Sequence, residues 1–508
     1  MVVDHLKYTT NEKGEKGKMK KRIFKTAALA ALVGAGVFGL ASCNGAPYKD
    51  EVIEVKDKVF AAPTSWTAPT VPAYAASTTD TGTVVNIRVW NDEFIKLFKT
   101  YYSDDVQEVH ELSEYTIPNP TGSGRLTVKF NMVANQDNAY QTALDTALAQ
   151  QSSAAADQKV DMFLLEADYA LKYVNTNLTV AVDDIGITAT DTANMYQYTK
   201  DVATSNNKLK ALSWQATPGL FAYRTDIAEA VFGAGNSSPE YVQSKINTWD
   251  KFNTVAAQMK EQGYTMLSGY DDAYRVFSNN ISQPLVDSAT GKITIDKELV
   301  KWIKQTKEFT NKGYNKGTSL WDDTWKAEQS INGSTFGFFY STWGINFTLK
   351  ENGEVKNAAG QDLTGKYRVC EGPASYFWGG TWLACANGTD NASAVAAIMK
   401  KMTCDQSTAK KITEETLDYT NNKPAMAQLA QSTTFGTEKC TFLGGQNHIS
   451  LFSAAAENIV MDKTTRWDQG INENLQKAMV DVFLGKVSLE EGYNSFFSKI
   501  KTVYPEFE

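Results

Sequence analysis

Three strand-length segments, with a helical segment between the last two, restrict the fold of this chain more than any other feature. Residues 84–90, 126–130 and 160–165 are rich in β-branched, aromatic and aliphatic residues. Between the second and third segments, small apolar residues recur on one helical face: Ala139, Ala143, Leu144, Ala147 and Leu148. A strand, a helix and a strand form a parallel unit with a crossover, so we predict an α/β layer architecture.

Composition disfavours several classes of protein. With 508 residues, 42% of them hydrophobic, the chain can bury large cores in more than one domain. Its net charge is −8, only seven basic residues are Arg, and no basic patch with interleaved aromatic residues occurs, so we expect no nucleic-acid partner. His5, His110 and His448 stand far apart, which argues against a histidine-rich metal site or a catalytic triad, and we expect no cofactor.

The first residues have the pattern of an export signal. Met19-Lys20-Lys21-Arg22 opens a basic segment, and residues 26–40 form an apolar run that ends in Leu40-Ala41-Ser42-Cys43. The run is shorter than the roughly 20 apolar residues that span a membrane. We predict that residues 1–42 are a leader starting at Met19. Leu-Ala-Ser-Cys resembles the bacterial lipobox, which makes Cys43 a candidate lipid anchor; the alternative is a simple secretory signal.

Two further features follow from export. Residues 43–82 are rich in Ala, Pro, Thr and Ser, so we predict a flexible tether between the lipid and the folded body. Four cysteines remain in a compartment that permits disulfides: Cys370, Cys385, Cys404 and Cys440. Cys370 and Cys385 flank a predicted strand–turn–strand, which favours the pairs 370–385 and 404–440. Four free thiols are an equal alternative.

Helix ends are marked in the second half of the chain. Thr248 is a candidate N-cap of a helix that Gly263 ends. Ser488 and Glu491 form a candidate capping box for the last helix. Trp302, inside a Lys-rich helical stretch, is interpreted as a packing residue.

Trp and Tyr residues stand beside carboxylates and amides at the ends of predicted strands. Trp90-Asn91-Asp92-Glu93 ends the first strand, and Glu166-Ala167-Asp168-Tyr169 follows the strand at 160–165. In open α/β sheets, ligands bind outside the carboxyl ends of strands. A sugar ring stacks its C–H face on an aromatic ring, and its hydroxyl groups bind carboxylates and amides. The same mixture recurs at 213–215, 270–272, 321–325, 340–343 and 377–382, so a neutral carbohydrate is the best-fitting ligand.

Nine segments in chain order carry a family resemblance: VNIRVWNDEF, DMFLLEADYALKYV, LSWQATPGLFAYR, SGYDDAYRVFSNN, SLWDDTW, FYSTWGINFTL, WGGTW, DYTNN and FLGGQNHI. Residues 84–508 resemble the extracellular solute-binding proteins of ATP-binding-cassette (ABC) sugar importers, the group of the maltose-binding protein, and within it a lipid-anchored oligosaccharide-binding branch of gut Firmicutes. The resemblance implies a type II periplasmic-binding-protein-like fold, in which two α/β lobes, joined by a hinge of several strands, close on a ligand in the cleft between them.

Family topology assigns one lobe to residues 84–218 plus 379–430 and the other to 219–378 plus 431–508. The chain would then cross between lobes near Pro218-Gly219, Gly379-Gly380 and Gly444-Gly445. Segment 104–125 departs from the family pattern and is expected to form a loop at the rim of the cleft.

The resemblance also implies which residues bind the ligand. The first lobe would contribute Trp90, Asn91, Glu93, Glu166, Asp168 and Tyr169, and aromatic residues would face the cleft at Trp214, Trp343 and Trp378. The other lobe would contribute Tyr270, Asp271, Arg275, Trp321 and Asp322. For Arg275, a structural ion pair is an equal alternative. Asp271-Asp272 and Asp322-Asp323 could instead ligate calcium, but no EF-hand loop surrounds them.

By this resemblance the chain is a monomeric receptor, not an enzyme, lipid-anchored on the extracellular face of the cell membrane. It would bind an oligosaccharide and deliver it to the permease of an ABC transporter. Two alternatives remain. A surface glycoside hydrolase would need two carboxyl groups about 5 Å apart, such as Glu93 with Glu166 or Asp168. A polysaccharide-adhesion lipoprotein would prefer long, insoluble chains.

Overall fold

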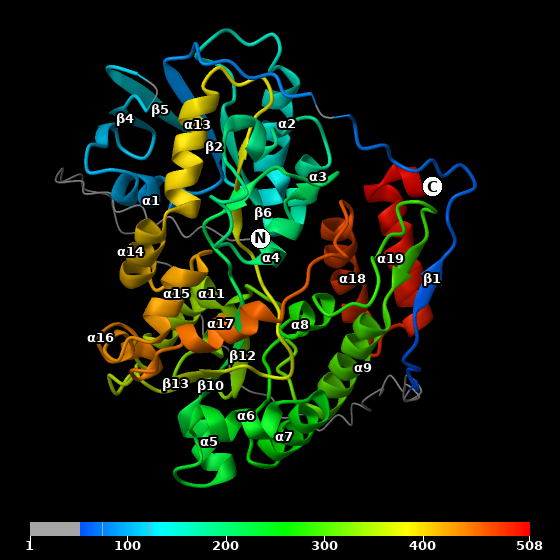
Figure 1. Cartoon of the computed structure of the whole chain (residues 1–508). Helices are drawn as coiled ribbons and strands as arrows, with labels where there is room; N and C mark the ends of the chain where they lie inside the picture. Colours follow the sequence, from blue (N-terminus) through cyan, green and yellow to red (C-terminus); the bar gives the residue numbers. More distant parts are fainter. Residues whose placement is uncertain (1–50, 74, 121) are drawn as a thin grey trace, which may run out of the picture. The chain divides into compact units, whose positions relative to one another are not determined.

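The strands predicted at 84–90, 126–130 and 160–165 form the middle of a seven-stranded sheet. The protein is described by a computed structural model that covers residues 51–508 except 74 and 121 (Figure 1). The predicted leader and Cys43 therefore lie outside the described residues. The order of the sheet is β3-β4-β5-β2-β6-β14-β9. Its strands are β2 (Val84–Val89), β3 (Gln107–His110), β4 (Glu114–Pro118), β5 (Arg125–Met132), β6 (Met162–Glu166), β9 (Leu212–Ser213) and β14 (Thr381–Cys385).

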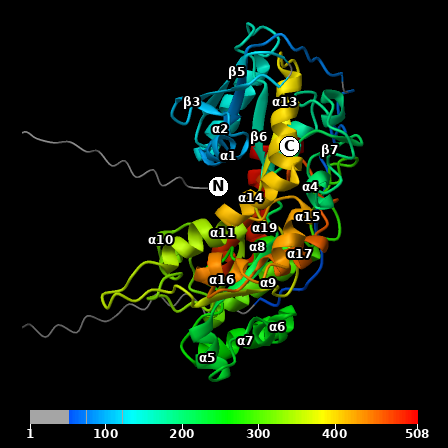
Figure 2. The ribbon, with the colours of Figure 1, turned by 60° about the vertical axis from the view of Figure 1, so that its left-hand side comes forward.

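The parallel unit predicted from the sequence is present at the centre of this sheet. Strand β2 pairs in parallel with both β5 and β6, so the crossover helix α2 (Ala139–Ala149) joins two strands that flank β2. Helix α13 (Ala392–Met399) covers the opposite face of the sheet from α2 (Figures 1 and 2). Both faces are thereby buried, which is why β6 and β14 carry apolar residues on successive positions.

A second, smaller sheet is built from β10 (Gly219–Arg224), β12 (Gly337–Ser341) and β13 (Tyr367–Cys370), with β10 in the centre. Both neighbours of β10 run antiparallel to it. Aromatic rings connect this sheet to its helices: Phe221 of β10 contacts Phe252 at 5.4 Å, and Phe252 contacts Phe309 at 6.3 Å. Each sheet thus packs against helices of its own, as a two-lobed α/β fold requires.

The other helices of the described residues fall into two groups. Those that pack near the first sheet are α1 (Glu93–Tyr101), α3 (Ala170–Val174), α4 (Gln197–Asp201) and α14 (Gln406–Thr416). Those of the other part are α5 (Thr225–Phe232), α6 (Pro239–Ile246), α7 (Trp249–Glu261), α8 (Tyr274–Ser278), α9 (Lys297–Lys312), α10 (Asp323–Ala327), α11 (Thr342–Gly344), α12 (Lys350–Gly353), α15 (Lys423–Ala430), α16 (Phe435–Lys439), α17 (Ile449–Glu457), α18 (Asp468–Phe483) and α19 (Leu489–Val503).

The helix ends predicted from the sequence are confirmed. The Thr248 side chain accepts a hydrogen bond from the Lys251 amide at the start of α7. Ser488 and Glu491 form the complete capping box of α19. Trp302 is fully buried in α9, and its indole N–H donates to the Tyr270 carbonyl at 3.3 Å. Among the described residues, no helix is long and apolar enough to span a membrane.

Three chain segments lie side by side between the two sheets. Pro218 forms a bridge with Phe377, and Gln215 forms a bridge with Thr420. The third segment, residues 417–422, connects α14, which packs on α1, to the helices that pack on β10. The prediction that Gly444-Gly445 is the third crossing is wrong, because Gly444 packs against Arg368 of β13, within the smaller sheet's part of the molecule.

Segment 104–125 is also not the loop that we predicted. It contains β3 and β4, which extend the edge of the large sheet by antiparallel pairing with β5. Tyr115 and Ile117 of β4 are fully buried, whereas the residues between them are not. This alternation adds the segment to the first core through every second residue.

The predicted flexible tether is likewise wrong for its described part. Strand β1 (Lys58–Phe60) pairs with β11 (Ile293–Ile295), and Thr79 and Thr81 donate backbone hydrogen bonds to Thr389 and Asp390. The tether was inferred from Ala, Pro and Thr, but the Phe60 ring, stacked on Phe497, fixes the segment to the folded body.

The two predicted disulfides are not formed, and all four cysteines are free thiols. Cys370 ends β13 of the three-stranded sheet, whereas Cys385 ends β14 of the seven-stranded sheet. The two residues therefore do not flank one hairpin, and the strand–turn–strand on which the pairing rested belongs to two different sheets.

Candidate functional site

The first strand ends in a buried ring rather than in an exposed platform. Trp90 follows β2, is only 8% exposed, and packs edge-on against Tyr140 and Tyr169 at 5.4 and 6.3 Å. The Asn91 side chain accepts a hydrogen bond from the Glu93 amide at 3.2 Å, which turns the chain into α1. Trp90 thus packs in the core beside the site and does not present a face for a ligand.

Glu93 begins a polar network that connects the two parts of the molecule. The Gln215 amide nitrogen donates to Glu93 at 2.8 Å and to Asp418 at 2.7 Å. Asp418 also accepts a hydrogen bond from the Thr342 hydroxyl at 2.7 Å. Burial and the nearby Asp418 charge raise the pKa of Glu93 to about 8, although the hydrogen bond from Gln215 opposes the shift. We call Glu93, Gln215, Thr342 and Asp418 the polar network.

Next to Thr342 lies an aromatic cluster, defined here as Trp321, Trp325, Tyr340, Trp343 and Trp378. The Trp321 and Trp343 rings are 6.2 Å apart and inclined by 22°, and the Trp378 ring stands edge-on to Trp343 at 5.2 Å. The Trp343 indole N–H donates to the Trp378 carbonyl at 2.8 Å, so this ring is held in place. Tyr340 and Trp325 are buried beneath the others. The cluster presents indole faces that a sugar ring can stack on.

Trp321 differs from its neighbours in the cluster. Its φ of +75° lies in the left-handed region, which disfavours a residue with a bulky side chain. The Trp325 indole N–H donates to Asp272 at 2.8 Å, whereas the Trp321 indole has no hydrogen bond with any of the described residues. Ring contacts alone therefore hold the Trp321 side chain over Trp343.

Two acidic turns flank the aromatic cluster. The Asp272 carboxylate accepts three hydrogen bonds, from the amides of Ser268 and Gly269 and from the Trp325 indole. Asp271 has a buried carboxylate oxygen without a hydrogen-bond partner, and burial, with the charge of Asp272, raises its pKa to about 7. Asp322 is exposed just before α10. Within residues 51–508 as described, no three His, Cys, Asp or Glu side chains are grouped as metal ligands.

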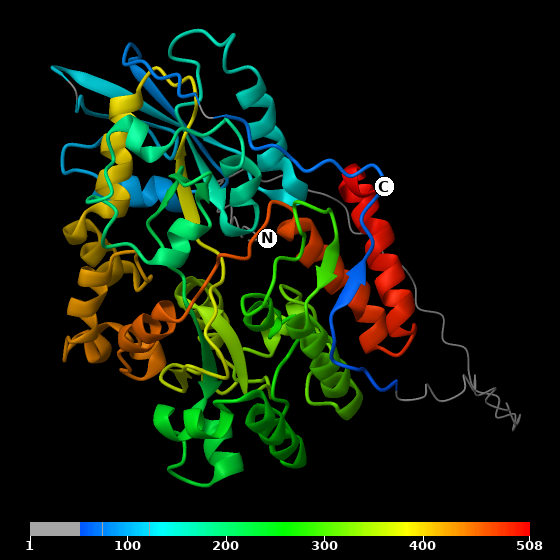
Figure 3. The ribbon, with the colours of Figure 1, turned by 45° about the vertical axis from the view of Figure 1, so that its right-hand side comes forward.

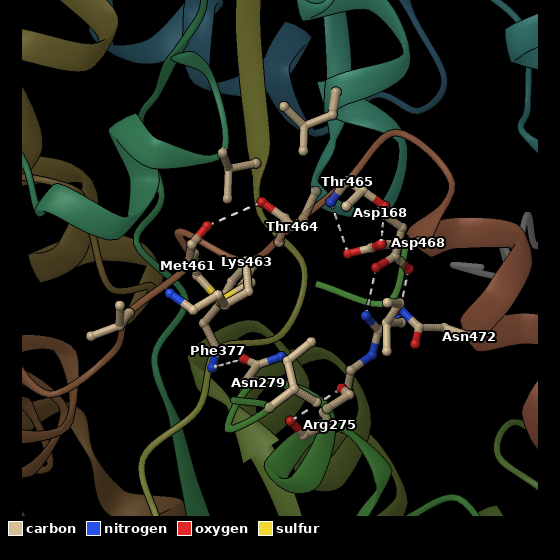
Figure 4. Close-up of a pocket in the computed structure, with 17 residues that line it drawn as sticks. Asp168, Arg275, Asn279, Phe377, Met461, Lys463, Thr464, Thr465, Asp468 and Asn472 are labelled. Atoms are coloured by element: carbon tan, nitrogen blue, oxygen red, sulfur yellow. Dashed lines mark hydrogen bonds and ion pairs between the residues drawn. The ribbon is translucent and has the colours of Figure 1, made fainter. Parts of the chain in front are cut away.

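A charged cavity lies between the two parts and is lined by residues of both (Figure 4). The two terminal nitrogens of the Arg275 guanidinium group donate hydrogen bonds to the Asp168 carboxylate, at 2.5 and 2.6 Å (Figure 4). Burial alone would raise the pKa of Asp168, but the charge and hydrogen bonds of Arg275 hold it below its usual value. Asp468 faces this pair, and burial raises its pKa to about 7. We call the residues around this space, Asp168, Arg275, Lys463, Asp468 and Asn472, the charged cavity.

The charged cavity has a volume of about 50 Å³. Small-molecule sites commonly measure roughly 300–1,000 Å³. This space is too small for an oligosaccharide, and the Arg275–Asp168 ion pair beside it joins helix α8 to the turn that follows β6.

The second crossing segment, which continues from Phe377 through residues 378–381, connects these groups. Thr381 pairs with Glu166 at the end of β6, and the Ala167 amide donates to the Gly380 carbonyl at 3.3 Å. Burial and the neighbouring charge of Asp168 raise the pKa of Glu166. Trp378 of the aromatic cluster thus stands three positions before Thr381, the residue that pairs with Glu166.

Several predicted site residues are core residues in this structure. Trp214 is 2% exposed and packs on Phe94 at 5.2 Å, and its indole N–H has no hydrogen-bond partner among the described residues. Tyr169 is buried under Trp90, and Tyr270 stacks on Phe483. Arg275 forms the ion pair that was its alternative interpretation. The structure brings Glu93, Glu166, Asp168, Trp343 and Trp378 to the space between the sheets.

Sequence reasoning did not select Gln215, Thr342, Asp418, Asp468 or Asn472. The first three lie inside segments that carried the family resemblance, in Ser213-Trp214-Gln215, Tyr340-Ser341-Thr342-Trp343 and DYTNN. Attention to amides and hydroxyls beside each Trp would have found Gln215 and Thr342, whereas Asp418 stands beside Tyr419 and no Trp is near it in the sequence. Asp468 follows Trp467, but no strand precedes it, so the strand-end pattern had no signal there.

Comparisons with known proteins identify the family and the fold. A family model described as bacterial extracellular solute-binding protein matches residues 121–437, more than half of the chain. A solved extracellular solute-binding protein of family 1 is 16% identical, with a TM-score of 0.65 over 83% of this chain and 99% of that one. No curated protein matches the chain.

Two more solved structures are similar in fold. One is the ABC-transporter-associated binding protein of B. animalis subsp. lactis Bl-04 in complex with beta-1,6-galactobiose, with 16% identity, 84% and 98% coverage of the two chains, and a TM-score of 0.57. The other is the sugar-binding protein MalE of Xanthomonas citri, with 13% identity, 84% and 97% coverage, and a TM-score of 0.58. The fold is thus the two-lobed periplasmic-binding-protein-like fold that the resemblance implied, and the chain belongs to the bacterial extracellular solute-binding proteins.

Proposed function

We propose that this protein captures a neutral oligosaccharide between its two lobes and delivers it to the permease of an ABC importer. The observation that carries the proposal is the aromatic cluster beside the polar network, in a chain of the solute-binding family. Indole faces suit the C–H face of a pyranose, and the carboxylates and amides around them suit its hydroxyl groups. The solved relatives with sugars in their names agree with this ligand class.

Binding and closure are coupled in this proposal. A sugar stabilises the closed form only by as much as it binds the closed form more tightly than the open one. The aromatic cluster and Asp271 lie in one part of the molecule, and Glu93, Glu166 and Asp168 in the other, so a sugar that contacts both sets is held only when the lobes are closed. No bond of the sugar is broken, and the protein acts as a monomeric receptor without a cofactor.

The place of action is part of the proposal. Cys43, modified with lipid, would hold the receptor on the extracellular face of the membrane beside its permease, as in the lipid-anchored branch that the sequence resembles. A single acyl chain binds membranes only marginally, so a doubly or triply acylated Cys43 is expected. Cys43→Ala should release the protein from the membrane fraction, and continued retention would contradict the anchor.

Isothermal titration calorimetry against a panel of α-glucans, fructans, galactosides and xylo-oligosaccharides tests the ligand class. We expect saturable binding of at least one soluble oligosaccharide, which chromatography recovers intact after long incubation. Cleavage products would instead indicate a glycoside hydrolase. Binding to insoluble polysaccharide, with no binding of short oligosaccharides, would indicate an adhesion protein.

A further inference from the structure

The described part of the predicted tether is attached to both lobes. Residues 53–73 and 75–82, which we call the strap, precede the first strand of the large sheet and follow the edge of the molecule past α18 and α19 (blue in Figure 3). We propose that the strap is a restraint on lobe opening: it is fastened at one end to each lobe, and its short middle section sets how far the lobes can separate. The proposal does not depend on which solute the protein binds.

The first end of the strap is fastened to the lobe of the small sheet. Strand β1 pairs with β11, and the Phe60 ring stacks on Phe497 of α19 at 4.4 Å and 15°. The Trp66 ring stacks on Phe507 at 5.2 Å, and its indole N–H donates to the Ser288 carbonyl at 3.3 Å. This end of the strap is therefore attached by two stacked aromatic rings and one strand pairing.

A glycine makes room for the second anchor. Gly291 has a φ of +70°, and a Cβ added there would lie 2.2 Å from the Trp66 ring. The turn before β11 therefore needs both the left-handed conformation and the absence of a side chain. The absence of a side chain at Gly291 thus leaves the space that the Trp66 ring fills.

The other end of the strap is fastened to the lobe of the large sheet. The Thr79 amide donates to the Thr389 carbonyl at 3.1 Å, and the Thr81 and Gly82 amides donate to the Asp390 carbonyl at 2.9 and 2.7 Å. Asp80 accepts a hydrogen bond from the Ser393 amide at 2.9 Å, at the start of α13. Residues 387–393 follow β14 directly, so this end moves with the large sheet.

The section between the two attachments is short and stiff. Nine residue steps separate Trp66 from Ala75, whose carbonyl accepts a hydrogen bond from the Asn387 side chain. A chain of this length spans at most about 30 Å. Pro69 and Pro72 fix φ at values that favour an extended chain, so this section cannot coil freely. A hinge opening that requires this section to span more than its maximal length must therefore detach one end of the strap.

A cut in the middle section tests the restraint in the free protein. A specific protease site is placed in residues 67–73, most of which are exposed, and the protein is cleaved after it has folded, so that Phe60 and Trp66 stay available to both the cut and the uncut form. Spin labels at Thr146→Cys in α2 and Asn311→Cys in α9, both exposed positions, report the distance between lobes. Cys404→Ser removes the thiol that, among the four described cysteines, is not buried, and Cys43, which lies outside the described residues, is replaced by Ser as well.

We expect the cut to lengthen and broaden the distance distribution measured by double electron–electron resonance without any ligand. A matched protein with the same site in the exposed turn at 355–361 keeps its strap intact and should show no change on cleavage. Asp80→Ala, which releases one attachment, should give a partial effect. Identical distributions before and after cutting the strap would overturn the proposal, whether or not the protein binds sugar.

Discussion

The aromatic cluster and the charged cavity lie in the same gap between the sheets but are built differently. Apart from Trp378 on a crossing segment, the aromatic cluster comes from the small-sheet lobe and carries no charge. The charged cavity takes Asp168 from the large-sheet lobe and Arg275 and Asp468 from the other. The cluster can therefore persist when the lobes open, whereas the ion pair exists only when they are closed. The first suits ligand capture and the second suits closure.

The largest expected effect comes from removing the central ring of the aromatic cluster. Trp343→Ala should weaken sugar binding about 30-fold, roughly 2 kcal/mol, because a buried aromatic anchor carries much of the energy of such an interface. Calorimetry measures the affinity, and thermal unfolding checks the fold. Phe347→Ala, which removes a 52% exposed ring four residues away, is the control and should bind as the unchanged protein does. Equal affinities of both variants would place Trp343 outside the site.

A smaller loss is expected from the ion pair. Arg275→Ala should weaken sugar binding about tenfold, roughly 1.4 kcal/mol, because Asp168 is left beside Asp468 without a partner in the closed form. Lys208→Ala, which removes an exposed ion pair with Asp183, should change nothing. Adding Asp168→Asn to Arg275→Ala should restore part of the affinity. If the double variant binds more weakly than Arg275→Ala, the unpaired charge is not the cause.

The polar network predicts a pH dependence of stability. The pKa of Glu93 is raised in the folded protein to about 8, so the folded state holds a proton that the unfolded state releases near pH 4.5. The free energy of unfolding should fall as the pH rises between these two values. Glu93→Gln keeps an oxygen for Gln215 and should flatten this part of the profile. Urea unfolding at several pH values measures it, and the same slope in both proteins would contradict the raised pKa.

The smallest effect is expected at Asp322. Its side chain is exposed and makes no capping hydrogen bond to α10. Asp322→Ala should leave sugar affinity unchanged and alter stability by less than about 0.5 kcal/mol. The variant to compare with Asp322→Ala is Asp271→Asn, because Asp271 has a buried oxygen that is free to accept a hydrogen bond from a sugar hydroxyl. A large loss of affinity in Asp322→Ala would extend the site onto the surface of α10.

Local chemistry made parts of this structure predictable. Thr248 and the pair Ser488 and Glu491 begin helices because their side chains satisfy backbone amides within three residues, a relation that the sequence contains in full. The strands around 84–90 and 160–165 follow from apolar runs. The polar residues at the ends of those strands predicted Glu93, Glu166 and Asp168 as site residues, and this assignment stays a prediction.

Other parts depend on partners far away in the chain. The strap has the composition of a linker, but Phe60 and Trp66 stack on Phe497 and Phe507, more than 430 residues later in the chain. Trp90 and Trp214 look like sugar platforms in the sequence, but packing neighbours bury them. The exposure of a side chain depends on which distant parts of the chain pack against it, and the periodicity of the sequence does not contain that information.

The sequence by itself determined the α/β class, the helix caps and the mixture of rings, carboxylates and amides, because each is set by residues that are neighbours in the chain. Tertiary structure alone decided which rings form the aromatic cluster, that Asp168 meets Arg275, that Cys370 and Cys385 belong to different sheets, and that the strap is attached at both ends. These depend on how the two sheets and their helices are placed against each other, and contacts of that kind join residues a hundred or more positions apart.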